Sequence, residues 1–253
     1  MKIVVKKRSL PEILALIALV IFLVVSIIDV TFYVQFLPRV TYKILIAISL
    51  ILLAVKELYK RKYDYRTIIG LFVTVLIYLL IAKMSSLTFN IAIGLFFIYG
   101  LRDIPFKSVA KTSLAVSLFM LMFIIISAEL GVILNYLEVS GGRVRNYLGF
   151  RYALFPSILL MNIVSIVFYL KQDRIQYWQW LLLAFSAIWV YDQTNSRLTF
   201  YSSCILLIFN LLIKWIPNLC SKLGYVFKAF KLTFIVNAII SFWVTMNYLN
   251  STN

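Results

Sequence analysis

The chain has 253 residues, of which 63% are hydrophobic and 13% charged, and its formal net charge is +16. No ordinary soluble domain has this composition, and the absence of histidine excludes His-based zinc sites, haem ligation through histidine and Ser-His-Asp triads. Apolar runs recur along the whole length without the alternation of a transmembrane β-barrel. The sequence therefore predicts one all-α, polytopic integral membrane domain over residues 1–253.

Nine transmembrane helices are predicted, because a bilayer core about 30 Å thick needs roughly 20 mostly apolar residues per span. In chain order the runs are 10–28, 40–55, 67–82, 86–101, 112–134, 153–170, 178–191, 198–213 and 233–249. Only Lys83-Met84-Ser85-Ser86 separates the third run from the fourth. We expect a tight hairpin there, with Lys83 reaching the interface.

The distribution of basic residues predicts an N-terminus on the inside and a C-terminus on the outside of the membrane. Every inside loop then carries at least two basic residues. The basic residues left on the outside are Arg39, Lys43, Lys83, Arg143, Arg145, Arg151 and Arg197. Inside loops that meet anionic headgroups account for the net charge, so no nucleic acid is expected as a partner. Residues 214–232 are expected to lie along the inner interface.

The longest external connection, about 129–152, carries three arginines on the side that basic residues usually avoid. Gly141-Gly142 permits a sharp turn, and Arg143 and Arg145 would share one side of an extended segment. Guanidinium groups bind phosphate oxygens through paired, charge-assisted hydrogen bonds. The pattern therefore favours a phosphate site, and the alternative is a solvated loop whose arginines touch lipid phosphates.

A second polar cluster, Asp192-Gln193-Thr194-Asn195-Ser196-Arg197, separates the seventh and eighth runs. It predicts a tight outer turn with two interpretations. One is a plain hairpin in which Asp192 pairs with Arg197 and polar side chains cap the helix ends. The other is a functional turn set low in a polar cavity, since ionisable residues at membrane depth are functional candidates.

No metal and no cofactor is expected. Cys204 falls within a span and Cys220 in an inside loop, which does not favour a disulfide or a metal site. Phosphate-binding loops of the P-loop kind are also absent from the sequence, which argues against ATP-driven chemistry. Any proton transfer must then use a carboxylate, a lysine, a tyrosine or water.

Two segments carry a family resemblance. Arg143-Val144-Arg145-Asn146-Tyr147-Leu148-Gly149-Phe150 resembles the "R…R…GF" segment of Wzy-type polysaccharide repeat-unit polymerases, within the O-antigen ligase/polymerase superfamily. Thr194-Asn195-Ser196-Arg197 resembles the "(T)-(N/D)-S-R" turn of the same family. Their order and separation also fit, over roughly residues 112–213.

The chain departs from the family pattern in two ways. Members often have a histidine shortly after the GF pair, where this chain reads Arg151-Tyr152-Ala153-Leu154-Phe155-Pro156. Members also usually continue through a large external loop and further spans, whereas this sequence stops at Asn253. On this resemblance we expect a shortened or fragmentary member of the family.

The resemblance implies a polymerase of capsular or O-antigen type. Such enzymes join undecaprenyl-pyrophosphate-linked oligosaccharide repeat units on the outer face, among membrane lipids and alongside flippase and chain-length regulator proteins. The implied catalytic residues are Arg143, Arg145 and Arg197, which would stabilise the leaving pyrophosphate, and Asp192 as base. The implied substrate-binding residues are Arg151, Glu138, Asn195 and Ser196, with Glu138 as the alternative base.

Other functions remain open at this point. A lipid-linked oligosaccharide ligase would use the same arginine chemistry with another acceptor. A flippase or transporter would need ionisable residues along a path through the membrane, and nearly all charges lie at the ends of the predicted spans. A non-catalytic membrane component of the same pathway is the remaining alternative.

Overall fold

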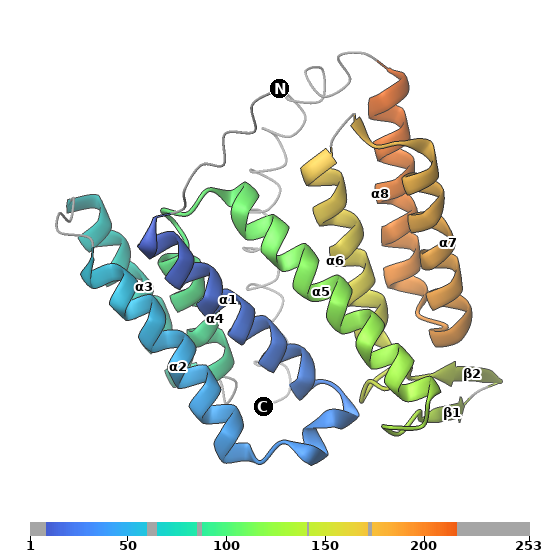
Figure 1. The fold of residues 1–253 in the computed structure, drawn as a ribbon, viewed down its shortest axis with the longest axis horizontal. Coiled ribbons are helices and arrows are strands. Elements are labelled where there is room, and N and C mark those ends of the chain that lie inside the picture. Colours follow the sequence, from blue (N-terminus) through green and yellow to red (C-terminus); the bar gives the residue numbers. More distant parts are fainter. Residues whose placement is uncertain (1–8, 60–64, 85–87, 141, 172–173, 217–253) are drawn as a thin grey trace, which may run out of the picture. The chain divides into compact units, whose positions relative to one another are not determined.

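Figure 1 shows the computed structural model of the chain, which describes residues 9–59, 65–84, 88–140, 142–171 and 174–216. The chain divides into two compact units, Met1–Cys204 and Ile205–Asn253. In the second unit the described residues are 205–216, which continue the last helix to its end. All the contacts discussed below lie within the first unit.

Eight α-helices occupy the described residues, and each coincides with a predicted apolar run. They are α1 (Leu10–Asp29), α2 (Arg39–Leu58), α3 (Tyr65–Met84), α4 (Thr88–Gly100), α5 (Phe106–Glu129), α6 (Leu154–Lys171), α7 (Tyr177–Thr194) and α8 (Arg197–Trp215), with a short 3-10 helix, η1 (Phe32–Phe36), after α1. The predicted ninth run, 233–249, lies outside the described residues. So do Cys220 and nearly all of the predicted inner segment 214–232.

Among the described residues, α1, α5, α6 and α8 are long and apolar enough to cross a membrane. The prediction of a mostly helical chain is confirmed, and four of its described helices could span a membrane by length and composition. The number of nine spans and the inside–outside orientation stay predictions.

Local sequence signals account for several helix starts. Pro11 lies in the first turn of α1, and Pro38 and Pro105 directly precede α2 and α5. Proline suits these positions because its ring presets a helical φ and the first helical N–H groups have no intrahelical partner. The side chains of Gln176 and Gln179 form a reciprocal capping box at the start of α7.

The connection between α5 and α6 differs from the prediction in two respects. The fifth run was expected to continue to residue 134, but α5 ends at Glu129 because Gly131 adopts a φ of 73°. A left-handed glycine is a common helix terminator. The expected loop 129–152 also contains an antiparallel hairpin of β1 (Leu137–Ser140) and β2 (Arg143–Asn146), at the lower right of Figure 1.

Three connections meet at one end of the first unit, which we call the hairpin end. A bridge between Thr31 and Phe150 joins the α1–α2 connection to the segment after β2. Asn146 of β2 donates through Nδ2 to Oε1 of Gln193 in α7, at 3.2 Å. These are the connections that the sequence assigned to one side of the membrane, so their grouping agrees with an alternating helical topology.

A cluster of charged side chains lies where α2 and α4 end. Lys56 is only 3% exposed and bonds to Oε1 of Glu57 and the carbonyl of Gly100, both at 2.8 Å. Arg102 bonds to both carboxylate oxygens of Glu57 and lies over the ring of Tyr99, 3.8 Å from its centroid. Full pairing of this kind is what allows a buried lysine.

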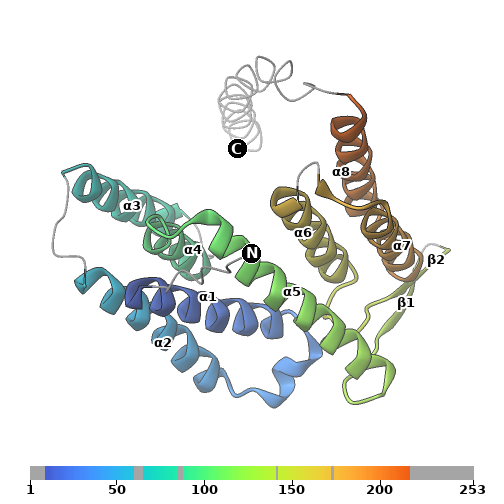
Figure 2. The ribbon, with the colours of Figure 1, turned by 45° about the horizontal axis from the view of Figure 1, so that its top comes forward.

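Helix α1 packs on α2 and α5, and α5 packs on α6 (Figure 2).

Candidate functional site

A hollow of about 290 Å³ lies at the hairpin end, between β2, the start of α6 and the α7–α8 turn. We call it the arginine hollow. Its lining consists of Arg143, Arg145, Tyr152, Ala153, Leu154, Asn195, Ser196, Arg197 and Leu198. All three arginines predicted to act on the pyrophosphate are therefore brought together, along with Asn195 and Ser196. Such a volume suits a headgroup-sized ligand.

The hairpin places the first two arginines. Side chains alternate between the faces of a strand, so Arg143 and Arg145 in β2 share one face, as predicted. Glu138 stands opposite Arg145 on β1, with its Oε2 3.9 Å from the Nη1 of Arg145. The turn between the strands uses Gly142 at a φ of 72°, a conformation that glycine adopts without strain.

The α7–α8 turn places the third arginine and is shorter than predicted. The prediction of a six-residue turn at 192–197 is wrong. Helix α7 continues through Asp192, Gln193 and Thr194, and α8 already begins at Arg197. Only two residues connect the helices. Asn195 turns the chain in a left-handed conformation (φ 50°, ψ 34°), which asparagine tolerates better than most residues.

Two hydrogen bonds fix this turn against α6. The Oγ of Ser196 donates to the carbonyl of Ala153 at 3.2 Å, and the hydroxyls of Ser157 and Thr194 lie 2.9 Å apart. Thr194 Oγ1 already donates to the carbonyl of Val190, so Ser157 must be the donor in that pair. Thr194 is fully buried, which makes this contact a firm link between α7 and α6.

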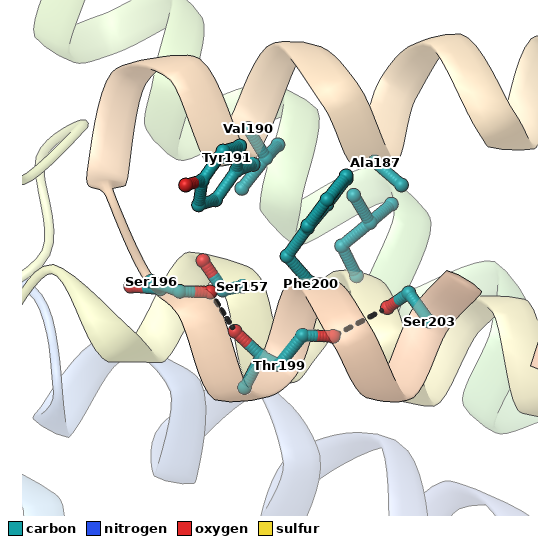
Figure 3. Close-up of a pocket in the computed structure, with 9 residues that line it drawn as sticks. Ser157, Ala187, Val190, Tyr191, Ser196, Thr199, Phe200 and Ser203 are labelled. Carbon is teal, nitrogen blue, oxygen red and sulfur yellow. Dashed lines mark hydrogen bonds between the residues drawn. The ribbon is translucent and has the colours of Figure 1, made fainter. Parts of the chain in front are cut away.

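A smaller pocket of about 10 Å³, room for about one water molecule, adjoins the turn and shares Ser196 with the arginine hollow. Its lining is Ser157, Leu160, Ala187, Val190, Tyr191, Ser196, Thr199, Phe200 and Ser203 (Figure 3). The rings of Tyr191 and Phe200 stack across it at 4.3 Å between centroids. The hydroxyls of Thr199 and Ser203 donate to backbone carbonyls one helical turn earlier, so both donors have an acceptor within the chain.

The two carboxylates predicted as candidate bases differ in their surroundings. Tyr147 donates its hydroxyl to Oε2 of Glu138 at 2.7 Å, and this hydrogen bond raises the pKa of Tyr147 to about 12. Glu138 is thus held beside Arg145. Asp192 is exposed, accepts a bond from Gln193 at 3.3 Å and does not line the arginine hollow. Among the described residues no ion pair joins Asp192 to Arg197, so the pair expected from the plain-hairpin interpretation is not formed.

Arg151 was expected near the substrate but does not line the arginine hollow. Its N–H donates to the carbonyl of Val30 at 2.9 Å, and its Nη1 lies 3.5 Å from the carbonyl of Asp29. Gly149 allows this change of direction with a φ of 80° in a space where a Cβ would lie 2.7 Å from Ile133. Arg151 therefore binds the end of α1.

Sequence reasoning missed the hairpin, the Tyr147–Glu138 bond and the Ser157–Thr194 bond. The alternation of apolar and polar residues around Gly141-Gly142 was a usable hairpin signal. The two side-chain bonds carry no local signal, since the second joins residues 37 positions apart.

Comparisons with known proteins add no relative, because no family model, no curated protein and no solved structure matches the chain. The resemblance to Wzy-type polymerases therefore stays a prediction based on the two short motifs. Within the part of the chain that the structure describes, no group of three or more cysteine and acidic side chains is placed to hold a metal ion.

Proposed function

We propose that the chain is a membrane glycosyl transferase of the polymerase type, acting on undecaprenyl-pyrophosphate-linked oligosaccharide repeat units at the outer face of a bacterial plasma membrane. The observation that supports this function is the convergence of Arg143, Arg145 and Arg197 on one hollow from two segments about 50 residues apart. Convergent guanidinium groups at a membrane-facing site suit a lipid-borne diphosphate.

The charge balance of the arginine hollow favours an anion. Arg145 has Glu138 at 3.9 Å, whereas among the described residues no ion pair involves Arg143 or Arg197. Three positive charges therefore face one carboxylate, and an added diphosphate would relieve their repulsion. Leu198 is 76% exposed at the rim of the hollow and offers an apolar start for a polyprenyl tail.

The proposed reaction transfers the growing glycan. The acceptor sugar hydroxyl of the next repeat unit attacks the anomeric carbon of the donor, and the bond from that carbon to the diphosphate oxygen breaks. The hydroxyl proton passes to a carboxylate, and the diphosphate leaves with the bonding electron pair on its prenyl carrier. The arginines act by stabilising the negative charge that grows on the leaving diphosphate, where preorganised donors contribute most.

Glu138 is the better-placed candidate base. Neither carboxylate lines the arginine hollow, but that of Glu138 lies 3.9 Å from Arg145, which does. Asp192 is exposed and bonds to Gln193, which does not line the hollow either. Proximity to the reacting groups comes before pKa in choosing a general base. This assignment reverses the sequence-based preference for Asp192.

The test is complementation of a deletion strain, with surface polysaccharide separated on a gel. Deletion should leave single repeat units at the surface, and the wild-type gene should restore the ladder. Arg143→Ala and Arg197→Ala should lose long chains, while Arg39→Ala, an exposed arginine at the start of α2, should keep them at equal protein levels. Normal ladders from both hollow variants would reject the proposal. Complete loss of surface repeats with internal accumulation of lipid-linked units would instead indicate a flippase.

A further inference from the structure

The connection between α5 and α6 exposes several large apolar side chains. Its members are Leu130, Val132, Leu134, Tyr136, Leu137, Val139 and Val144, each between 46% and 74% exposed. We call this set the apolar hairpin surface. A patch of this kind in contact with water is unusual for a folded protein and marks a surface that binds something.

The hairpin is amphipathic because of its register. Val139 pairs with Val144, and both side chains project from one face. Glu138 pairs with Arg145, and these project from the opposite face, where Arg145 lines the arginine hollow. The charged face is therefore used by the candidate site. On the other face, which we call the valine face, Asn146 bonds to Gln193, whereas the side chains of Val139 and Val144 are 69% and 54% exposed.

The two ends of this connection are held at one level by the helices that flank it. Both α5 and α6 belong to the helices long and apolar enough to cross a membrane. Helix α5 has 24 residues, and at 1.5 Å per residue this gives about 36 Å, enough to pass a hydrocarbon core about 30 Å thick. The chain leaves α5 at Glu129 and enters α6 at Leu154, so the hairpin stays close to one bilayer surface.

We propose that the apolar hairpin surface dips into the lipid bilayer surface at which α5 and α6 end. The exposed side of α5 supports this occupant, because Phe119, Met122 and Ile126 follow at helical spacing and continue directly into Leu130. The exposed apolar side chains along this candidate span thus extend to the residue at which the connection to the hairpin begins. Exposed Tyr136 adds the amphipathic aromatic ring typical of the membrane–water interface.

The insertion is shallow. A two-stranded hairpin has two edges with unpaired backbone groups, and such edges are not tolerated in the hydrocarbon core. The backbone therefore stays in the hydrated headgroup layer, and the side chains of Val139 and Val144 reach the boundary with the acyl chains. At that depth Arg143 and Arg145 lie level with lipid phosphates. If the proposed function holds, a lipid-linked diphosphate would meet the arginine hollow by lateral diffusion, but the insertion itself does not depend on that function.

The experiment is site-directed spin labelling of the full chain in vesicles of phosphatidylethanolamine and phosphatidylglycerol. Cys204 and Cys220 are first replaced by serine, and Val139→Cys and Val144→Cys are labelled one at a time. Accessibility to oxygen, which concentrates in lipid, is compared with accessibility to a water-soluble nickel chelate. Ile126→Cys serves as the lipid-facing reference and Asp192→Cys, exposed at the end of α7, as the aqueous reference.

Oxygen should exceed the nickel chelate at both hairpin positions, with a ratio between those of the two references. Greater access for the chelate at both positions would place the hairpin in water and overturn the proposal. Low access for both reagents would mean that protein covers the valine face, either residues 217–253 or a second copy of the chain, and would overturn it equally. None of these results depends on polymerase activity, so this test and the ladder assay can fail separately.

Discussion

The arginine hollow makes a quantitative prediction about the binding of a prenyl diphosphate. Replacing Arg143 or Arg197 with glutamine removes the same charge and leaves a polar side chain of moderate length. The structure distinguishes the two sites by exposure, because Arg143 is half-buried on β2 whereas Arg197 is exposed at the first position of α8. The loss of affinity should therefore be larger for Arg143→Gln than for Arg197→Gln.

The two losses can be estimated from the surroundings of each guanidinium. A hydrogen bond to a charged group away from bulk water contributes about 1.5–3 kcal/mol, so Arg143→Gln should weaken binding about 10- to 150-fold. An exposed ion pair contributes about 0.2–1 kcal/mol, so Arg197→Gln should weaken it about 1.5- to 5-fold. Arg145 already has Glu138 at 3.9 Å, and its replacement should fall between these limits.

The measurement is titration of the detergent-solubilised full chain with farnesyl diphosphate, a short prenyl diphosphate that is soluble enough for calorimetry. Arg39→Gln is the matched control, since it removes an exposed arginine from the hairpin end without touching the hollow. Equal affinities for Arg143→Gln and Arg39→Gln would show that the hollow is not the diphosphate site. A larger loss for Arg197→Gln than for Arg143→Gln would refute the ranking by exposure.

Four further predictions concern the supports of the site. Glu138→Gln should bind farnesyl diphosphate about 1.5- to 5-fold more tightly, because it relieves competition for a neighbouring arginine, yet should form less polymer; unchanged affinity would contradict this. The bond to Glu138 raises the pKa of Tyr147 to about 12, above the ordinary value of 10.0, so it stabilises the fold below about pH 10 and is lost as the pH rises toward 12. The unfolding temperature of the wild type should therefore fall more steeply between about pH 10 and 12 than that of Tyr147→Phe. Parallel curves of unfolding temperature against pH would argue against the bond. Gly149→Ala should destabilise the protein by about 2–5 kcal/mol through a strained φ and a clash, and a change below about 1 kcal/mol would mean that the segment moves freely. Thr194→Val leaves a buried hydroxyl on Ser157 without its acceptor and should cost about 1–3 kcal/mol. Ser202→Ala is the control and should cost little, because Ser202 is only half-buried on α8 and its hydroxyl bonds to the carbonyl of Leu198 in the same helix.

Helices were predictable from the sequence because each apolar run is long and the membrane-spanning pattern depends only on local composition. Their ends were less predictable. The seventh helix was expected to end before Asp192, because Asp192, Gln193 and Thr194 are polar. In the structure Thr194 is the last residue of α7, with its hydroxyl bonded to the carbonyl of Val190, and Asn195 then ends the helix with a left-handed turn. The backbone at a helix end follows hydrogen bonds and φ, which a hydropathy pattern does not record.

The candidate site was predictable in part. Arg143 and Arg145 were expected to share one face of an extended segment, and they do. Arg151 has the same charge and lies only six positions after Arg145, yet it binds the end of α1 through contacts with Val30 and Asp29. No local pattern separates Arg151 from the other two, because its direction depends on a partner more than a hundred residues earlier in the chain.

The arrangement of the arginines implies that the unfavourable free energy of bringing like charges together is overcome during folding and not during ligand binding. Asn146 ties β2 to Gln193 of α7, and Ser196 ties the α7–α8 turn to the start of α6. The two walls of the hollow are therefore joined to each other and to a common helix before any anion arrives. Preorganised charges of this kind need no rearrangement when negative charge develops on a leaving group, which is the condition under which electrostatic stabilisation is most effective. Weakening the hydrogen bond between Asn146 and Gln193 should accordingly reduce turnover more than ground-state binding. The arginines could still gather around a bound diphosphate, but they would have to reorganise in each transition state.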